Sequence, residues 1–151
     1  VNEDRAHFTM WCMLSSPLIA GNGVQTMSAA TQSILTNKWA IAVNQDILGK
    51  QATLFTHINS SIVDQASSSQ VWTKPLHAPT GALAVALLNR GSVATRIGLD
   101  FSDLAAAANY EVLDLWKNGE SLGVQKKLSA MVPPTAAELY KLIPQASSVF
   151  V

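Results

Sequence analysis

Charge is scarce in this chain. Charged residues make up 13% of its 151 residues, whereas roughly a quarter is usual for a free-standing soluble domain. Ten basic residues balance ten acidic ones, and neither sign forms a run. The balance gives no reason to expect nucleic acid or an anionic membrane as a partner. The low total predicts that much of the surface contacts other protein.

Cysteine is almost absent. Cys12 is the single cysteine, so an internal disulfide is excluded. It lies within an apolar helical pattern, which favours a buried structural thiol. A catalytic thiol would need a histidine base close by. His7 falls on a poorly matching face of the same helix, so we do not expect a thiol nucleophile.

Long apolar runs are also missing. No stretch approaches the roughly 18 residues that span a bilayer, because the run WCMLSSPLIAG is broken by two serines and a proline. No pattern of a signal peptide is present either. The chain begins at Val1, inside the expected first turn of a helix, which predicts a processed product, a fragment or the visible part of a longer chain.

Apolar residues are plentiful, at 48%, and in the first third of the chain they follow a helical period. A helix with an apolar surface on nearly all sides is expected from Glu3 to Ser15, and Pro17 ends it. A short buried parallel strand is expected at Leu18–Ala20. Two further helices are expected, one capped by Ser28 and running to Leu35, and one over Lys38–Asn44.

Beyond Gly49 the pattern changes to alternation, which is typical of strands. Turn-forming residues separate the runs, and short strands at this spacing favour an antiparallel sandwich. We therefore divide the chain into residues 1–48 and 49–151. The expected strands are Ala52–Ile58, Gln70–Pro75, Ala82–Asn89, Ala94–Asp100, Tyr110–Trp116, Leu128–Val132 and Glu138–Ile143.

Several strings together resemble the C-terminal portion of glycoside hydrolase family 27, the family of α-galactosidases and α-N-acetylgalactosaminidases. They cover almost the whole chain in the correct order. The strings are HFTMWCMLSSPLIAGN, ILTNKWAIAVNQDILGKQ, VWTKPL, GALAVALLNRG, YEVLDLWKNGESLG and AMVPPTAAELYKLI.

The resemblance implies a fold and a mechanism. Residues 1–48 would be the last βα elements of a (β/α)8 barrel, and residues 49–151 the antiparallel β-sandwich that follows the barrel. The family hydrolyses glycosides with retention of configuration, using two aspartates as nucleophile and acid/base, roughly 5 to 5.5 Å apart. The resemblance places both aspartates on earlier barrel strands, upstream of Val1.

We therefore assign no catalytic residue to this chain. None of its ten carboxylates matches either family motif, and barrel active sites lie at the carboxyl ends of strands, away from a sandwich. We expect these carboxylates to be solvated. They are Glu3, Asp4, Asp46, Asp64, Asp100, Asp103, Glu111, Asp114, Glu120 and Glu138.

Binding residues are few. Phe8 aligns with a position that forms an apolar wall beside the sugar in some members of the family, although a core role is the alternative. Trp11 and Trp39 are interpreted as packing residues. His57 and His77 lack a second ligand at metal spacing, so no metal is expected. No motif for a cofactor was found, and Asn59 begins a glycosylation sequon.

The sequence is compatible with three functions. The first is the C-terminal part of an α-galactosidase-like hydrolase, which is catalytically incomplete alone. The second is a non-catalytic, galactosidase-derived structural subunit of a larger assembly. The third is a carbohydrate-binding sandwich, for which Trp72, Tyr110 and Trp116 are the available aromatics.

Partner and location follow from these alternatives. Residues 1–48 carry more apolar side chains than they can enclose, so they should pack against the N-terminal barrel part of the same enzyme or against another chain. An α-galactoside would bind only after such completion. The resemblance implies a secreted, lysosomal or vacuolar enzyme, and the structural alternative implies an organellar complex.

Overall fold

The computed structural model describes residues 1–55, 68–104, 107 and 109–145. Three α-helices come first in the chain, and the strands follow. The helices are α1 (Asn2–Met13), α2 (Ala29–Leu35) and α3 (Lys38–Asn44). The strands are β1 (Thr53–Leu54), β2 (Ser69–Pro75), β3 (Leu83–Asn89), β4 (Thr95–Asp100), β5 (Tyr110–Asp114), β6 (Glu120–Gln125), β7 (Lys127–Val132) and β8 (Ala136–Pro144).

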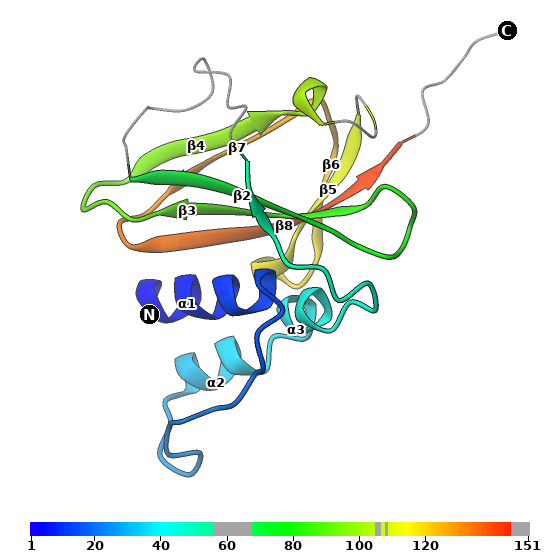
Figure 1. Cartoon of the computed structure of the whole chain (residues 1–151). Coiled ribbons are helices and arrows are strands. Elements are labelled where there is room, and N and C mark those ends of the chain that lie inside the picture. The colour runs from blue at the N-terminus through cyan, green and yellow to red at the C-terminus, as the bar shows by residue number, and fades with distance from the viewer. Residues whose placement is uncertain (56–67, 105–106, 108, 146–151) are drawn as a thin grey trace, which may run out of the picture.

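The strands form two antiparallel sheets. The larger has the order β1-β2-β3-β8-β5-β6, and the smaller pairs β4 with β7. Figure 1 shows the larger sheet in the middle, with β4 and β7 on one face and the helices on the other. The predicted antiparallel sandwich is therefore confirmed. It carries a third, helical layer.

Strand β3 shows why the larger sheet takes a layer on each face. Side chains alternate along a strand, and here the alternation separates small from large residues. Ala84 and Ala86 belong to the core on the helix side. Val85 and Leu87 belong to the core between the two sheets. All four are fully buried, and the small alanines let α1 lie close to the sheet.

The caps of the short helices agree with their sequences. The Ser28 hydroxyl accepts a hydrogen bond from the Thr31 N–H at 3.1 Å and begins α2, as predicted. The Asn37 side chain accepts from the N–H groups of Trp39 and Ala40 and begins α3. Such caps satisfy backbone donors that have no partner within the helix. Among the described residues, no helix has the length and apolar character needed to cross a bilayer.

The sequence analysis missed one strand and predicted another that does not form. Strand β6 was not predicted, because its sequence ESLGVQ contains glycine and lacks the apolar alternation of a core strand. The strand expected at Leu18–Ala20 is not formed. A parallel strand needs neighbours to bond its backbone. No described strand pairs with this segment, and Ile19 is 75% exposed.

Helix α1 is better covered than the sequence indicated. Phe8, Cys12 and Met13 are at most 4% exposed, and they share a core with Ala84 and Ala86 of β3. The sheet thus supplies much of the cover that α1 needs, and Figure 1 shows α1 lying along it. On this face, the sheet of the same chain covers the apolar residues of α1.

A close approach of backbone and ring joins α3 to the turn before β6. Gly119 has a φ of +73°, and a Cβ at this position would lie 2.6 Å from Cζ2 of Trp39. Glycine is required here for two reasons, the positive φ and the absence of a side chain. Trp39 is thus a packing residue, as its sequence context suggested.

We expect Gly119→Ala to lower the free energy of unfolding by about 2 to 4 kcal/mol, because it adds a clash with Trp39 to the strain of a positive φ. Gly123→Ala is the matched control. Its φ is +81° and no atom lies within 4 Å of the added Cβ, so it should cost about 1 kcal/mol. Urea denaturation measures both. Equal losses would contradict the proposed clash.

Candidate functional site

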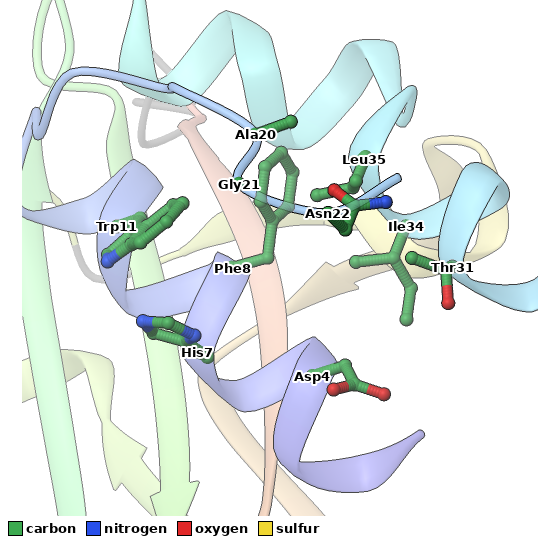
Figure 2. Close-up of a pocket in the computed structure, with 10 residues that line it drawn as sticks. All are labelled: Asp4, His7, Phe8, Trp11, Ala20, Gly21, Asn22, Thr31, Ile34 and Leu35. Carbon is green, nitrogen blue, oxygen red and sulfur yellow. The ribbon is translucent and has the colours of Figure 1, made fainter. Parts of the chain in front are cut away.

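A pocket lies between α1, the segment before α2, and α2 itself. Its volume is about 240 Å³. Figure 2 shows the ring of Phe8 pointing toward Ala20 and Gly21 across this pocket. The lining residues are Asp4, His7, Phe8, Trp11, Ala20, Gly21, Asn22, Thr31, Ile34 and Leu35.

The walls of the pocket are mainly apolar and aromatic. Phe8 is 4% exposed and belongs to the core as well as to the lining, so both of its predicted roles are compatible with its position. The rings of His7 and Trp11 meet edge to face, with centroids 4.4 Å apart. Aromatic faces with a few polar groups are typical of ligand pockets.

The pocket lacks a pair of acids. Asp4 is the one carboxylate among its described lining residues. Retaining hydrolysis of a glycoside needs two carboxylates on opposite sides of the scissile bond. The pocket can therefore contact a sugar or a protein segment, but it cannot supply this chemistry by itself. Nor does the described part of the chain bring together three or more residues of the types that bind metals.

Cys12 lies on the buried side of α1, away from the pocket lining. It is fully buried, and burial raises the pKa of its thiol from 9.0 to about 12. The nearby charge of Lys74 lowers this pKa by a smaller amount. The thiolate is the reactive form, so the geometry agrees with the predicted structural thiol.

We expect Cys12 to be unreactive in the folded protein. A pKa of about 12 instead of 9.0 reduces the thiolate fraction at neutral pH about a thousandfold, and burial blocks access besides. Titration with dithiobis-nitrobenzoate should detect no fast-reacting thiol in buffer and one per chain in urea. Rapid modification of the folded protein would contradict the assignment.

A second cluster of ionisable groups lies where α1 meets the sheet. The guanidinium of Arg5 pairs with the carboxylate of Glu138 on β8 and lies over the ring of Trp116, 4.9 Å from its centroid. The Trp116 indole N–H donates to the Thr9 hydroxyl at 3.2 Å. These contacts fix α1 on the sheet, and all of these groups are already partnered. We interpret the cluster as structural.

The expectation of solvated carboxylates was wrong for two members of the sandwich. The Glu138 side chain is 18% exposed because it pairs with Arg5. Asp114 is 4% exposed and accepts hydrogen bonds from the N–H groups of Trp116 and Lys117, at 3.1 and 3.2 Å. Capping of this short turn explains its burial. The alternation of apolar residues along a strand does not predict that Asp114 caps the following turn.

Burial raises the pKa of Glu138 above its ordinary value of 4.5, and the charge of Arg5 opposes this rise. Because the folded state then holds the proton more tightly than the unfolded state, the associated stability is present below pH 4.5 and is lost as pH rises through the folded pKa. Glu138→Gln removes this titration.

We therefore expect the free energy of unfolding of the wild type, relative to that of Glu138→Gln, to fall as pH rises from 4 to 7. Urea denaturation of both proteins at the two pH values measures the difference. A relative stability that is constant or increases with pH would show that Arg5, rather than burial, dominates the pKa.

The other candidate residues fall in separate places. Asn59 and His57 lie outside the described residues. The backbone N–H of His77 donates to the Asp46 carboxylate. For the carbohydrate-binding alternative, Tyr110 is fully buried and Trp72 and Trp116 are partly buried. These three rings therefore do not form an exposed platform for a sugar.

Sequence reasoning missed Lys74. This residue of β2 is fully buried, and its ammonium donates to Cys12 O at 3.2 Å, Ser15 Oγ at 2.8 Å and Val43 O at 2.6 Å. Burial lowers its pKa, against the smaller influence of Asp46. One feature of the sequence could have predicted this burial. Lys74 is two residues from Trp72 in the same strand, so both side chains lie on the face of β2 that the helices cover.

Comparison with known proteins matches both parts of the chain. Residues 66–142 match the family model for the α-galactosidase C-terminal β-sandwich domain. Residues 1–46 match the family model described as α-galactosidase A. The α-galactosidase A model thus matches first along the chain, and the C-terminal sandwich model follows it.

Individual relatives agree with the family models. Alpha-galactosidase 2 of Arabidopsis thaliana is 35% identical over 147 residues, which are 93% of this chain and 33% of the relative. The α-galactosidase of Coffea arabica is 35% identical, over 95% of this chain and 36% of the relative. The chain thus spans about a third of the length of the curated relatives that it matches.

Solved structures give the same result. α-Galactosidase I from Mortierella vinacea superposes with a TM-score of 0.82 at 31% identity, over 97% of this chain and 36% of that one. A GH27 β-L-arabinopyranosidase from Geobacillus stearothermophilus gives 0.81 at 27% identity, over 96% of this chain and 31% of that one.

Proposed function

The chain belongs to glycoside hydrolase family 27, the family of the α-galactosidases, and we propose that it works as the C-terminal part of a retaining α-galactosidase-like hydrolase. The observation that carries the proposal is the order of the two family matches, residues 1–46 and then 66–142. Together the two matches cover most of the sandwich and the helices that precede it.

We further propose that residues 1–48 are the last βα elements of a (β/α)8 barrel. The segment Leu18–Ala20 lies between α1 and α2, as a barrel strand lies between its helices. Its sequence is apolar, yet Ile19 is 75% exposed and the segment has no partner strand among the described residues. Pairing with a neighbouring barrel strand would bury it and satisfy its backbone.

The partner that fits this surface is the N-terminal barrel part of the same protein. The pocket beside Phe8 and Trp11 is mainly apolar, and Ala20–Asn22 line it on one side. Val24, in the same region, is 70% exposed. Exposed apolar groups gathered around one helical pair are typical of an incomplete interface. On this proposal Phe8 forms part of an apolar wall beside the sugar.

Catalysis then requires residues outside this chain. A retaining hydrolase places two carboxylates roughly 5 to 5.5 Å apart. Asp114 and Glu138 are occupied by a cap and an ion pair, and Asp4 stands alone in the pocket lining. The nucleophile and the acid/base are therefore proposed to lie on the barrel part that this chain lacks.

We expect the isolated 151 residues to show no turnover of p-nitrophenyl α-galactoside, and the intact protein that contains them to hydrolyse it. Turnover by the isolated chain would contradict the proposed incompleteness. Intact-mass measurement tests the alternative of a structural subunit. A native polypeptide of 16.1 kDa, held in a large complex without hydrolase activity, would favour that alternative.

A further inference from the structure

The ammonium group of Lys74 connects the sandwich to the ends of two helices. Its three hydrogen bonds go to the carbonyl of Cys12 in the last turn of α1, the carbonyl of Val43 in the last turn of α3, and the hydroxyl of Ser15. An ammonium has three donors, so all of them are used. Helix carboxyl ends favour a cation.

Ser15 has an unusual backbone. Its φ is +53°, in a region where glycine is the common residue after a helix. The N–H of Ser15 donates to Cys12 O at 3.3 Å and that of Ser16 to Trp11 O at 3.0 Å, which is the hydrogen-bond pattern of a Schellman cap. A serine here carries strain that glycine would avoid, but its hydroxyl supplies the third acceptor for Lys74.

The same end of α1 leads into the pocket. The Asn44 side chain donates to Trp11 O at 3.3 Å and to Ser16 O at 2.8 Å. Trp11 lines the pocket from one side, and the chain that leaves Ser16 lines it from the other with Ala20–Asn22. The contacts of Lys74 and Asn44 therefore hold both walls at the point where they separate.

We propose that Lys74 is a positioning residue that sets, from the sandwich, the conformation of residues 15–22 and thereby the shape of the pocket. The effect on catalysis rests on the function proposed above. The effect on the conformation of this segment does not depend on it.

Ser15→Gly gives a sharp test of the structural part. If Ser15 were only a helix cap, glycine would relieve the strain at φ +53° and slow hydrogen exchange of the Ser16 amide, or leave it unchanged. If the hydroxyl anchors Lys74, exchange at Ser16 should become at least about tenfold faster. Hydrogen exchange of the intact protein, followed by mass spectrometry of residues 14–22, distinguishes the two results.

Lys74→Met tests the lysine itself, with Lys141→Met as the control. Lys141 also lies in the larger sheet, and its ammonium donates to Ala78 O at 3.1 Å in an exposed position. Exchange in residues 14–22 should accelerate in Lys74→Met and not in Lys141→Met, with Ala84–Leu87 of β3 remaining protected. Acceleration spread evenly over the chain would overturn the proposal and indicate general destabilisation.

Activity separates this proposal from the proposed function. In the intact protein, Lys74→Met should lower kcat/KM for p-nitrophenyl α-galactoside at least about tenfold, whereas Lys141→Met should keep the wild-type value. An inactive wild type would refute the proposed hydrolase, and the exchange data would still decide the role of Lys74. Wild-type kinetics together with unchanged exchange in Lys74→Met would refute the positioning role.

Discussion

The larger sheet is apolar on both faces, and the rest of the structure depends on covering them. Val85 and Leu87 of β3 need the layer formed by β4 and β7, and Ala84 and Ala86 need the helices. Buried apolar area contributes about 25 cal/mol per Å², so neither face can remain open without a large loss of stability. Helix α1 and the sheet therefore share one core, although the sequence changes its periodicity between them.

Much of the fold could be predicted because local and global preferences agree. Ser28 begins a helix in the sequence and in the structure, and the alternation within β3 is long enough to be unambiguous. Strand β6 was not predicted, because an edge strand with exposed residues needs no apolar alternation in its sequence. Leu18–Ala20 reads as a strand, yet strand formation is a property of a pair, and the described residues provide no neighbour.

The candidate site was less predictable than the fold, for a related reason. Phe8 could be singled out by its place in an apolar helix, but its position across the pocket from Ala20–Asn22 depends on how the chain turns after Ser15. The burial of Lys74 could not be predicted from the sequence, because a lysine in a strand is usually solvated. Its burial is acceptable only because three acceptors from separate elements converge on it, and that convergence is a tertiary property.

The structural neighbours indicate where selectivity for the sugar does not reside. An α-galactosidase and a β-L-arabinopyranosidase superpose on this chain almost equally well, with TM-scores of 0.82 and 0.81. These two enzymes act on different sugars, as their names state, while sharing this region of the fold. Fold alone does not fix function. The architecture of the sandwich and its helical layer is thus common to both enzymes, so this architecture does not by itself choose the sugar. The positioning of residues 15–22 by Lys74, as proposed above, is compatible with an architecture that both enzymes share. Selection of the sugar by the sandwich fold is not compatible with it.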